Sequence, residues 1–224
     1  FSKKIKKDTS KSHSMAENTG FVTNFLAGVV SKDSYKQLIA DFYFIYTALE
    51  EQVDKFKNDP FIAPIAFDEL KRVPALEKDC EFYWGKNWRS IIAPTDACKN
   101  YVARLKKINA KFLVGHHYTR YLGDLSGGQI LKNIANKSMN LNGKGLAFYE
   151  FENIPHAGNF KNRYRTALDN LPITWSDGEL IINEANYAFK LNMDVFDEIG
   201  SKEKFPLIST IKGLLQFTWR SIKS

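Results

Sequence analysis

Apolar residues recur at steps of three and four along almost the whole chain, and this periodicity is what most constrains the fold. In the segment 35–56 they fall on one face over about six helical turns. No segment alternates as a half-buried strand would, and no internal repeat or low-complexity linker divides the chain. The sequence therefore predicts one all-α domain over residues 1–224, with roughly seven or eight helices.

Turn residues set the expected boundaries of the other helices. Further helices are expected at 67–84, 96–137, 159–170, 176–199 and 207–222, the second of them broken at a cluster of glycines. Between these helices, Pro60, Pro172 and Gly200 mark connections. The segment 139–151, MNLNGKGLAFYEF, is predicted to form a loop and a short extended piece, because Asn-Gly and Gly favour turns.

The composition indicates a globular protein, with 44% hydrophobic and 25% charged residues. A formal charge of +7 favours an acidic partner, such as nucleic acid, a membrane surface, an anionic ligand or an acidic protein. Nucleic acid is not expected, because the lysines are scattered rather than clustered with aromatic residues. No apolar run is long enough to span a membrane. Cys80 and Cys98 lack metal or redox spacing and are expected to be free thiols in a reducing compartment.

The stretch RYLGDLSGGQI, residues 120–130, places three glycines inside a predicted helix, where each costs up to about 1 kcal/mol relative to alanine. Gly123 and Gly127 are four residues apart and share a face, so a flat or bulky ligand could approach the backbone where the helix bends. The alternative is that Gly127 and Gly128 simply end one helix. A phosphate-binding loop is excluded, because the motif lacks the required lysine and follows no strand.

Two further patterns, one within this stretch and one in the helix expected at 176–199, each allow a structural and a functional interpretation. Asp124 follows Arg120 by four residues, as in a surface ion pair worth about 0.3–0.5 kcal/mol. Beside a ligand, the same acid could hold water or relay protons. Phe189, Asn192 and Phe196 share a helix face that packs in a core or lines a ligand pocket.

Two basic segments have the same ambiguity. Lys6, His13 and Glu17 would share a face of one helix, with the first two about 10.5 Å apart. The histidine is then either solvated or a metal ligand. Lys161 and Arg165 are four residues apart and form either a solvated basic face or a pair that binds carboxylates.

Four segments, in order and spacing, resemble the heme oxygenase family over nearly the whole chain: KSHSMAENTGFV, YTRYLGDLSGGQIL, FKNRYR and NEANYAFKLNMDVF. These segments are most similar to those of the soluble cyanobacterial and algal plastid branch of the family. The resemblance implies that heme b binds between a proximal helix and a glycine-kinked distal helix, as both substrate and oxygen-activating cofactor. With O2, its ring would be opened at the α-meso carbon to give biliverdin IXα, carbon monoxide and ferrous iron.

The resemblance also implies residue roles. His13 would be the axial ligand of the heme iron. Asp124 would order distal water, while Gly123 and Gly127 would crowd the heme and its oxygen. The segment 115–121, GHHYTRY, stands where the family often has AHSYTRY or AHAYTRY, and neither of its adjacent histidines is assigned as a ligand. The heme-binding set implied is Lys6, His13, Glu17, Tyr118, Arg120, Lys161, Arg165, Phe189, Asn192 and Phe196, of which Lys6, Lys161 and Arg165, with Tyr118 nearby, would hold the propionates.

This branch of the family takes electrons from ferredoxin, an acidic protein that would suit the basic charge. The branch further implies phycobilin biosynthesis, a bilin reductase downstream, and a plastid stroma or cyanobacterial cytoplasm. The printed sequence has neither a secretory signal nor the hydrophobic C-terminal anchor of animal relatives, so a soluble monomer is expected. The competing hypothesis is a non-catalytic heme carrier on the same fold, which would need no Asp124.

Overall fold

The computed structural model describes residues 1–202, and every regular element within them is helical, which confirms the all-α prediction. The α-helices are α1 (Ser2–Asp8), α2 (Ser10–Glu17), α3 (Gly20–Leu26), α4 (Lys32–Lys55), α5 (Val73–Trp84), α6 (Asp96–Lys107), α7 (Ala110–Ser138), α8 (Ala157–Asp169) and α9 (Trp175–Ser201). Three short 3-10 helices join them: η1 (Asp68–Leu70), η2 (Trp88–Ser90) and η3 (Ala147–Tyr149). The described residues form more α-helices than predicted because the first 26 residues contain three short ones.

The helices expected from periodicity are present, with boundaries set by local caps. The side chain of Ser31 accepts the Ser34 N–H at 3.1 Å and starts α4. A capping box of Thr174 and Asp177 starts α9. The helix expected from residue 67 begins only at Val73, after the separate turn η1.

Two helix boundaries were predicted wrongly. The helical pattern of 96–137 is divided at Asn109, whose side chain accepts the Phe112 N–H at 3.1 Å and caps α7. The break expected at the glycines of 120–130 does not occur, because α7 continues through them. The bend expected there stays a prediction.

The loop 139–151 also differs in part from the prediction. Gly143 and Gly145 have positive φ angles of 77° and 68°, as turn residues require. The extended piece, however, is the 3-10 turn η3.

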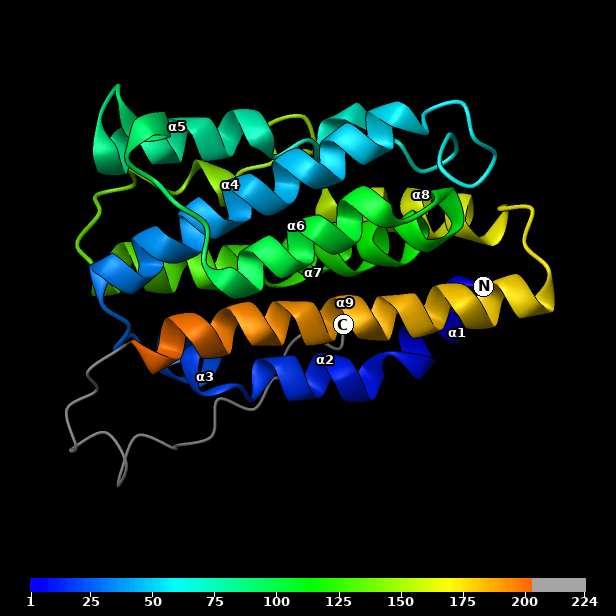
Figure 1. The fold of residues 1–224 in the computed structure, drawn as a ribbon, viewed down its shortest axis with the longest axis horizontal. Coiled ribbons are helices and arrows are strands. Elements are labelled where there is room, and N and C mark those ends of the chain that lie inside the picture. The colour runs from blue at the N-terminus through cyan, green and yellow to red at the C-terminus, as the bar shows by residue number, and fades with distance from the viewer. Residues whose placement is uncertain (203–224) are drawn as a thin grey trace.

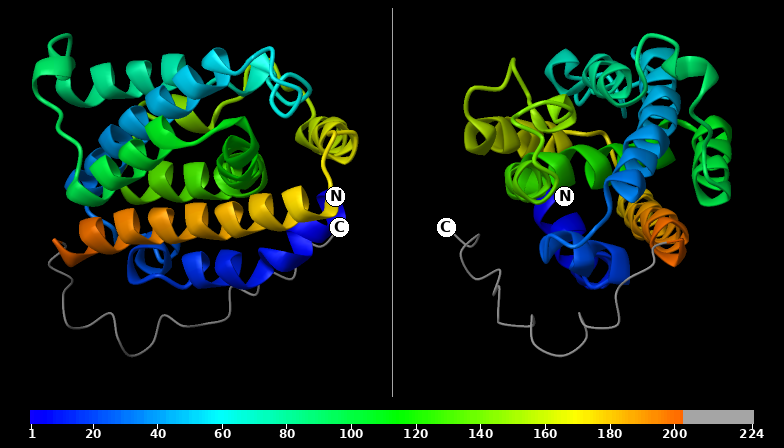
Figure 2. Two further views of the ribbon diagram at one scale, coloured as in Figure 1. Left: turned by 45° about the vertical axis from the view of Figure 1, so that its right-hand side comes forward. Right: turned by 90° about the vertical axis from the view of Figure 1, so that its left-hand side faces the viewer.

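The long helices α7 and α9 pack side by side and form the centre of the molecule (Figure 1). One side of α9 packs on α6 and α7, and the other side on α2 and α3, while α5 covers α4. The turned views show the N-terminal helices together beneath α9 (Figure 2). The N-terminal helices are thus placed against the same two long helices that carry the glycine motif and the aromatic stripe.

Three further expectations concern the chain as a whole. No helix within residues 1–202 is long and apolar enough to cross a membrane. Cys80 and Cys98 are buried free thiols. The helix expected at 207–222 lies outside the described residues.

Candidate functional site

A cavity of about 140 Å³ opens between α3, α4, α7, η3 and α9. Most of its wall is apolar. The aromatic rings of the wall are Phe21, Phe25, Phe42, Phe148, Tyr149 and Phe196. Its polar lining comes from α7, which contributes Arg120 and Asp124 beside Gly123 and Gly128. A flat apolar ligand with one polar edge fits such a cavity.

Gly123 faces open space. A Cβ atom built at this position would meet no other atom within 4 Å, and the residue is exposed. Packing within the described residues therefore does not require a glycine at position 123. At Gly128, the second glycine of the cavity wall, a Cβ would lie 3.5 Å from the ring of Tyr149, an ordinary contact. Gly127 is half-buried, and its contact with a ligand stays a prediction.

Asp124 is part of a buried polar network rather than a surface ion pair. Its side chain is 12% exposed, and its Oδ2 accepts a hydrogen bond from the Tyr46 hydroxyl. Arg120, 6% exposed, lies 3.7 Å from Asp124 Oδ1, donates to the Tyr46 hydroxyl at 3.1 Å and also donates to Asn192. Burial raises the pKa of Asp124, against the opposing effects of Arg120 and Tyr46. A carboxyl group with a raised pKa at a cavity wall is suited to holding and passing a proton.

The network continues through the core to the surface. Asn192 lies close enough to the Tyr101 hydroxyl to act on its pKa, and this hydroxyl lies 3.3 Å from Nδ1 of His116. Nε2 of His116 lies 2.8 Å from Glu184, which also accepts two hydrogen bonds from the partly exposed Arg104. Burial acts to raise the pKa of Glu184, but the bonds from His116 and Arg104 outweigh it and hold the pKa at about 2. Polar groups thus connect the cavity wall with the surface of α6.

Sequence reasoning missed the links Tyr46, Tyr101 and Glu184. In the sequence, Tyr46 is simply one of the periodic positions of the segment 35–56. The network pairs residues of α4, α6, α7 and α9 that are up to 80 positions apart, as Arg104 and Glu184 are. No local spacing could reveal such pairs.

His13 lies in α2 with its side chain 49% exposed. Its Nδ1 is 3.4 Å from Oε1 of Glu17, as the spacing of four predicted, and its ring packs edge-on against Phe189 at 5.8 Å. With Nδ1 facing the carboxylate, Nε2 remains available for a metal. The expectation that Lys6 shares its helix is wrong, because α1 ends before Thr9 and α2 begins after it.

Lys6 nevertheless lies close enough to Lys161 and Arg165 for the three cations to form a cluster. Burial lowers the pKa of Lys161, and the nearby charges of Arg165 and Lys6 lower it further. Arg165 also acts on the pKa of Tyr118, which burial raises. None of these cations forms an ion pair within residues 1–202: the only hydrogen bond of Arg165 to a side chain is to Asn162. A cluster of like charges without an acidic partner favours an anionic ligand with more than one negative group.

One face of α9 links His13 with the cavity. Phe189 contacts His13, and Phe196, two turns further on, lines the cavity and stacks on Phe21 at 5.9 Å. The two phenylalanines are about 10.5 Å apart along the helix axis. Asn192 lies between them in sequence and is buried against Arg120. Of the predicted stripe, Phe196 therefore lines the cavity and Asn192 takes part in the polar network, while Phe189 packs against His13.

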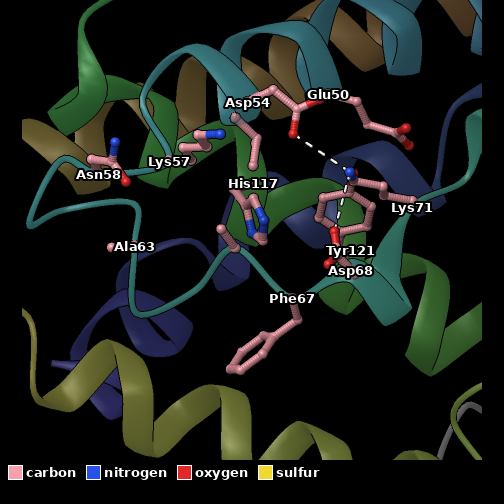
Figure 3. Close-up of a pocket in the computed structure, with 12 residues that line it drawn as sticks. Glu50, Asp54, Lys57, Asn58, Ala63, Phe67, Asp68, Lys71, His117 and Tyr121 are labelled. Atoms are coloured by element: carbon pink, nitrogen blue, oxygen red, sulfur yellow. Dashed lines mark ion pairs between the residues drawn. The ribbon is translucent and has the colours of Figure 1, made fainter.

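A second cavity of about 230 Å³ lies on another side of α7, at the end of α4 (Figure 3). Its charged groups largely neutralise one another, since Lys71 pairs with Asp54 at 3.5 Å and with Asp68 at 3.1 Å. His117 lines this cavity, and burial lowers its pKa to about 3. Its Nδ1 lies 2.7 Å from the Tyr164 hydroxyl. His117 thus joins α7 to α8, away from the cavity that holds Asp124.

Within residues 1–202, the fold and site define an all-α protein with an apolar slot, a glycine-lined wall, an accessible histidine on α2 and a cluster of cations without ion pairs. The sequence profile of the heme oxygenase family matches residues 1–198. The chain belongs to the heme oxygenase family and is an enzyme of that class.

Relatives and solved structures agree with this assignment. Heme oxygenase 1 of Synechocystis sp. is 50% identical over 198 residues, which cover 87% of this chain and 82% of the relative. Heme oxygenase of Rhodella violacea is 49% identical over 201 residues, covering 88% and 86% of the two chains. The crystal structure of the Synechocystis heme oxygenase-1 in complex with heme superposes with a TM-score of 0.86 at 49% identity, over 88% of this chain and 91% of that one.

The residues present fit heme. Two propionates would supply the negative charge that Lys6, Lys161 and Arg165 lack, and His13 offers a ring nitrogen for the iron. The open space beside Gly123 leaves room for the flat ring. Heme binding is indicated by the family, and these residues have the chemistry that it requires.

Proposed function

We propose that this enzyme opens heme at the α-meso carbon and releases biliverdin IXα, carbon monoxide and ferrous iron. O2 is the oxidant and reduced ferredoxin the electron donor. The observation that supports a catalytic role over a carrier role is Asp124, a carboxyl group with a raised pKa at the wall of the cavity. A protein that only bound heme would gain nothing from burying this group at a cost in stability.

Heme supplies both the iron that activates oxygen and the ring that is cleaved. His13 would hold the iron, with Nε2 the ring nitrogen that faces away from Glu17, and Glu17 would fix the orientation of the imidazole. Lys6, Lys161 and Arg165 bind the propionates and so set the rotation of the ring within the slot. This rotation determines which meso carbon faces the distal wall.

Asp124 holds and transfers protons at the cavity wall formed by α7. Tyr46 donates to Oδ2, which leaves Oδ1 to exchange a proton with water in the cavity. Arg120 holds the phenol of Tyr46 in place and does not compete strongly for Oδ1, since it is 3.7 Å away. Gly123 leaves space for that water beside the ring. The apolar rings of the cavity exclude other water, which strengthens these interactions.

The net charge of +7 suits ferredoxin, because opposite charges accelerate association. We place the enzyme in phycobilin biosynthesis, in a plastid stroma or a cyanobacterial cytoplasm, with a bilin reductase consuming the product. The similarity to enzymes of Synechocystis sp. and Rhodella violacea supports this placement.

The test is to mix the protein with hemin, reduced ferredoxin and O2 and to follow the absorption spectrum. Loss of the Soret band with a matching gain of biliverdin IXα is expected, at a rate that falls with ionic strength. A stable Soret band without biliverdin would instead identify a heme carrier. In a parallel sample, His13→Ala should shift or abolish the Soret band and stop turnover, and an unchanged spectrum with full activity would refute the ligand assignment.

A further inference from the structure

The turn η3 forms one wall of the cavity but has little structure of its own. It contributes Phe148 and Tyr149 to the lining. A single 3-10 turn has few internal hydrogen bonds, so its position depends on contacts from elsewhere. Helices α5 and α7 both pack on η3, and Gln129 of α7 donates to the Tyr149 carbonyl oxygen at 3.0 Å. Two buried charged groups, one on α5 and one just before it, also bind η3 although neither lines the cavity.

Asp79 of α5 holds the amide side of η3. Its carboxylate is 1% exposed; Oδ1 accepts the Ala147 N–H and Oδ2 accepts the Phe148 N–H, both at 2.8 Å. These N–H groups belong to the first turn of η3 and have no partner within it. One buried carboxylate therefore satisfies both donors.

Arg72, just before α5, holds the carbonyl side. Its buried guanidinium donates from Nη1 to the carbonyl oxygens of Phe148 at 3.2 Å and Glu150 at 2.5 Å. The backbone N–H of Arg72 in turn donates to Glu50 of α4 at 2.5 Å. Two buried groups of opposite charge thus grip opposite sides of the same turn.

The start of the segment is fixed as well. Gly145 has a φ of 68°, and a Cβ there would lie 2.5 Å from both the Phe82 ring and the Tyr83 hydroxyl. That hydroxyl donates to the Gly145 carbonyl oxygen at 2.9 Å. The backbone of the loop therefore lies directly against α5.

The position of η3 is transmitted to Asp124 through two aromatic rings. The Phe148 ring packs on Tyr46 at 5.5 Å and on Phe42 at 5.1 Å between ring centres. Tyr46 is the phenol that donates to Asp124. A shift of the Phe148 backbone would therefore move the Tyr46 ring and alter the contact with Asp124.

Burying two charged groups is a costly way to hold a loop if only its general position matters. Each charge here makes two directional bonds, which fix the turn more narrowly than apolar contacts could. We propose that Asp79 and Arg72 are positioning residues for heme cleavage: by gripping η3, they hold Phe148 against Tyr46 and so keep the Tyr46 hydroxyl on Asp124. This inference rests on the distal role of Asp124 proposed above.

The test compares Asp79→Asn with Glu77→Gln in the heme-loaded enzyme. Asn keeps the size of the side chain but has one acceptor oxygen, so one N–H of η3 loses its partner. Heme affinity should not change, while single-turnover formation of biliverdin falls about tenfold. The C–O stretching frequency of the carbon monoxide complex should shift, because the distal wall moves. Glu77 lies on the same helix but pairs with Arg89, and its variant should change neither rate nor frequency.

Tyr83→Phe provides a milder second variant that keeps the ring and removes only the bond to Gly145. A smaller loss of rate and a frequency shift in the same direction are expected. Unchanged rate and frequency in both variants would overturn the proposal. Loss of heme affinity in parallel with the rate would also overturn the proposal. Asp79 and Arg72, which we call the η3 clamp, would then only maintain the fold of the cavity.

Failure of the clamp can be told apart from failure of the proposed distal role. If Asp124→Asn turns over normally, the role of Asp124 is wrong, whatever Asp79→Asn does. If Asp124→Asn is inactive and Asp79→Asn turns over normally, only the proposed positioning role of Asp79 and Arg72 is wrong.

Discussion

The two halves of α7 use glycine for opposite reasons. At Gly115, a Cβ would lie 2.8 Å from the backbone nitrogen of Ala185 and 2.9 Å from the carbonyl oxygen of Ile181, both on α9. At Gly123, two turns further along, a Cβ would meet nothing within 4 Å. The first glycine is required by the packing of two helices, whereas packing within residues 1–202 does not require the second, and we propose that it leaves room for heme.

The charged residues of the two halves differ in the same way. In the first half, His116 is paired on both ring nitrogens, and its carboxylate partner Glu184 is fully satisfied. In the second half, Asp124 Oδ1 at the cavity wall faces Arg120 at 3.7 Å and makes no hydrogen bond within residues 1–202. Satisfied polar groups stabilise the fold, while a group with free capacity can act on a ligand.

The largest effect should come from the second half. Asp124→Asn should reduce biliverdin formation by about 100-fold or more, the usual scale of a lost proton relay, while the Soret band persists. Single-turnover spectroscopy with hemin measures both. Asp194→Asn, which removes an exposed carboxylate paired with Lys190, is the control and should turn over normally. A normal biliverdin yield from the Asp124 variant would contradict the statement that the second half of α7 acts on the ligand.

The next effect concerns Glu184, which should matter for stability. Its pKa is about 2 in the folded protein against an ordinary value of 4.5, so its ionised form stabilises the fold above pH 4.5, and this contribution is lost as the pH falls towards 2. Glu184→Gln should lower the free energy of unfolding by about 3 kcal/mol at pH 7. Urea unfolding without heme, at pH 7 and pH 3.5, should show this difference shrinking. A constant difference at both pH values would contradict it.

Gly115→Ala should destabilise the protein by about 1–3 kcal/mol, because the backbone of α9 must move to admit the methyl group. The midpoint of urea unfolding measures this loss. Turnover per folded molecule should be unchanged. Unaltered stability would mean that α7 and α9 separate at no cost, and the structural half of the comparison would fail.

The smallest change in stability should be a gain. Gly123→Ala should stabilise the heme-free protein by up to about 1 kcal/mol, since alanine is the better helix former and the methyl group meets no neighbour. Heme turnover should fall in the same variant. Thermal unfolding without heme and biliverdin formation with heme test the two statements separately, and full activity would show that the space beside Gly123 is not used.

Helix positions could be predicted from the sequence because each follows from residues close together in the chain. The periodicity of 35–56 predicted α4 within a few residues. The division at Asn109 could not be foreseen, because asparagine caps a helix only when the backbone N–H three residues later turns towards its side chain. The same applies to η3, which is held by residues nearly 70 positions away rather than by its own sequence.

In the candidate site, too, some residues can be predicted from the sequence and others cannot. Asp124, the glycines and the pair Lys161 and Arg165 are recognisable from short motifs and from resemblance. Tyr46 carries no such signal, because on an amphipathic helix it is indistinguishable from the apolar residues around it. Only the packed structure shows that its hydroxyl turns towards Asp124.

The empty space beside Gly123 has a consequence for how this chain would change under selection. Selection for folding alone would favour alanine at this position, and selection for turnover would oppose it. A library of variants selected for thermal stability without heme should therefore lose glycine at position 123 and lose activity with it. Added heme should retain the glycine, so the residue found at this one position would show whether the substrate was present while the protein was evolving.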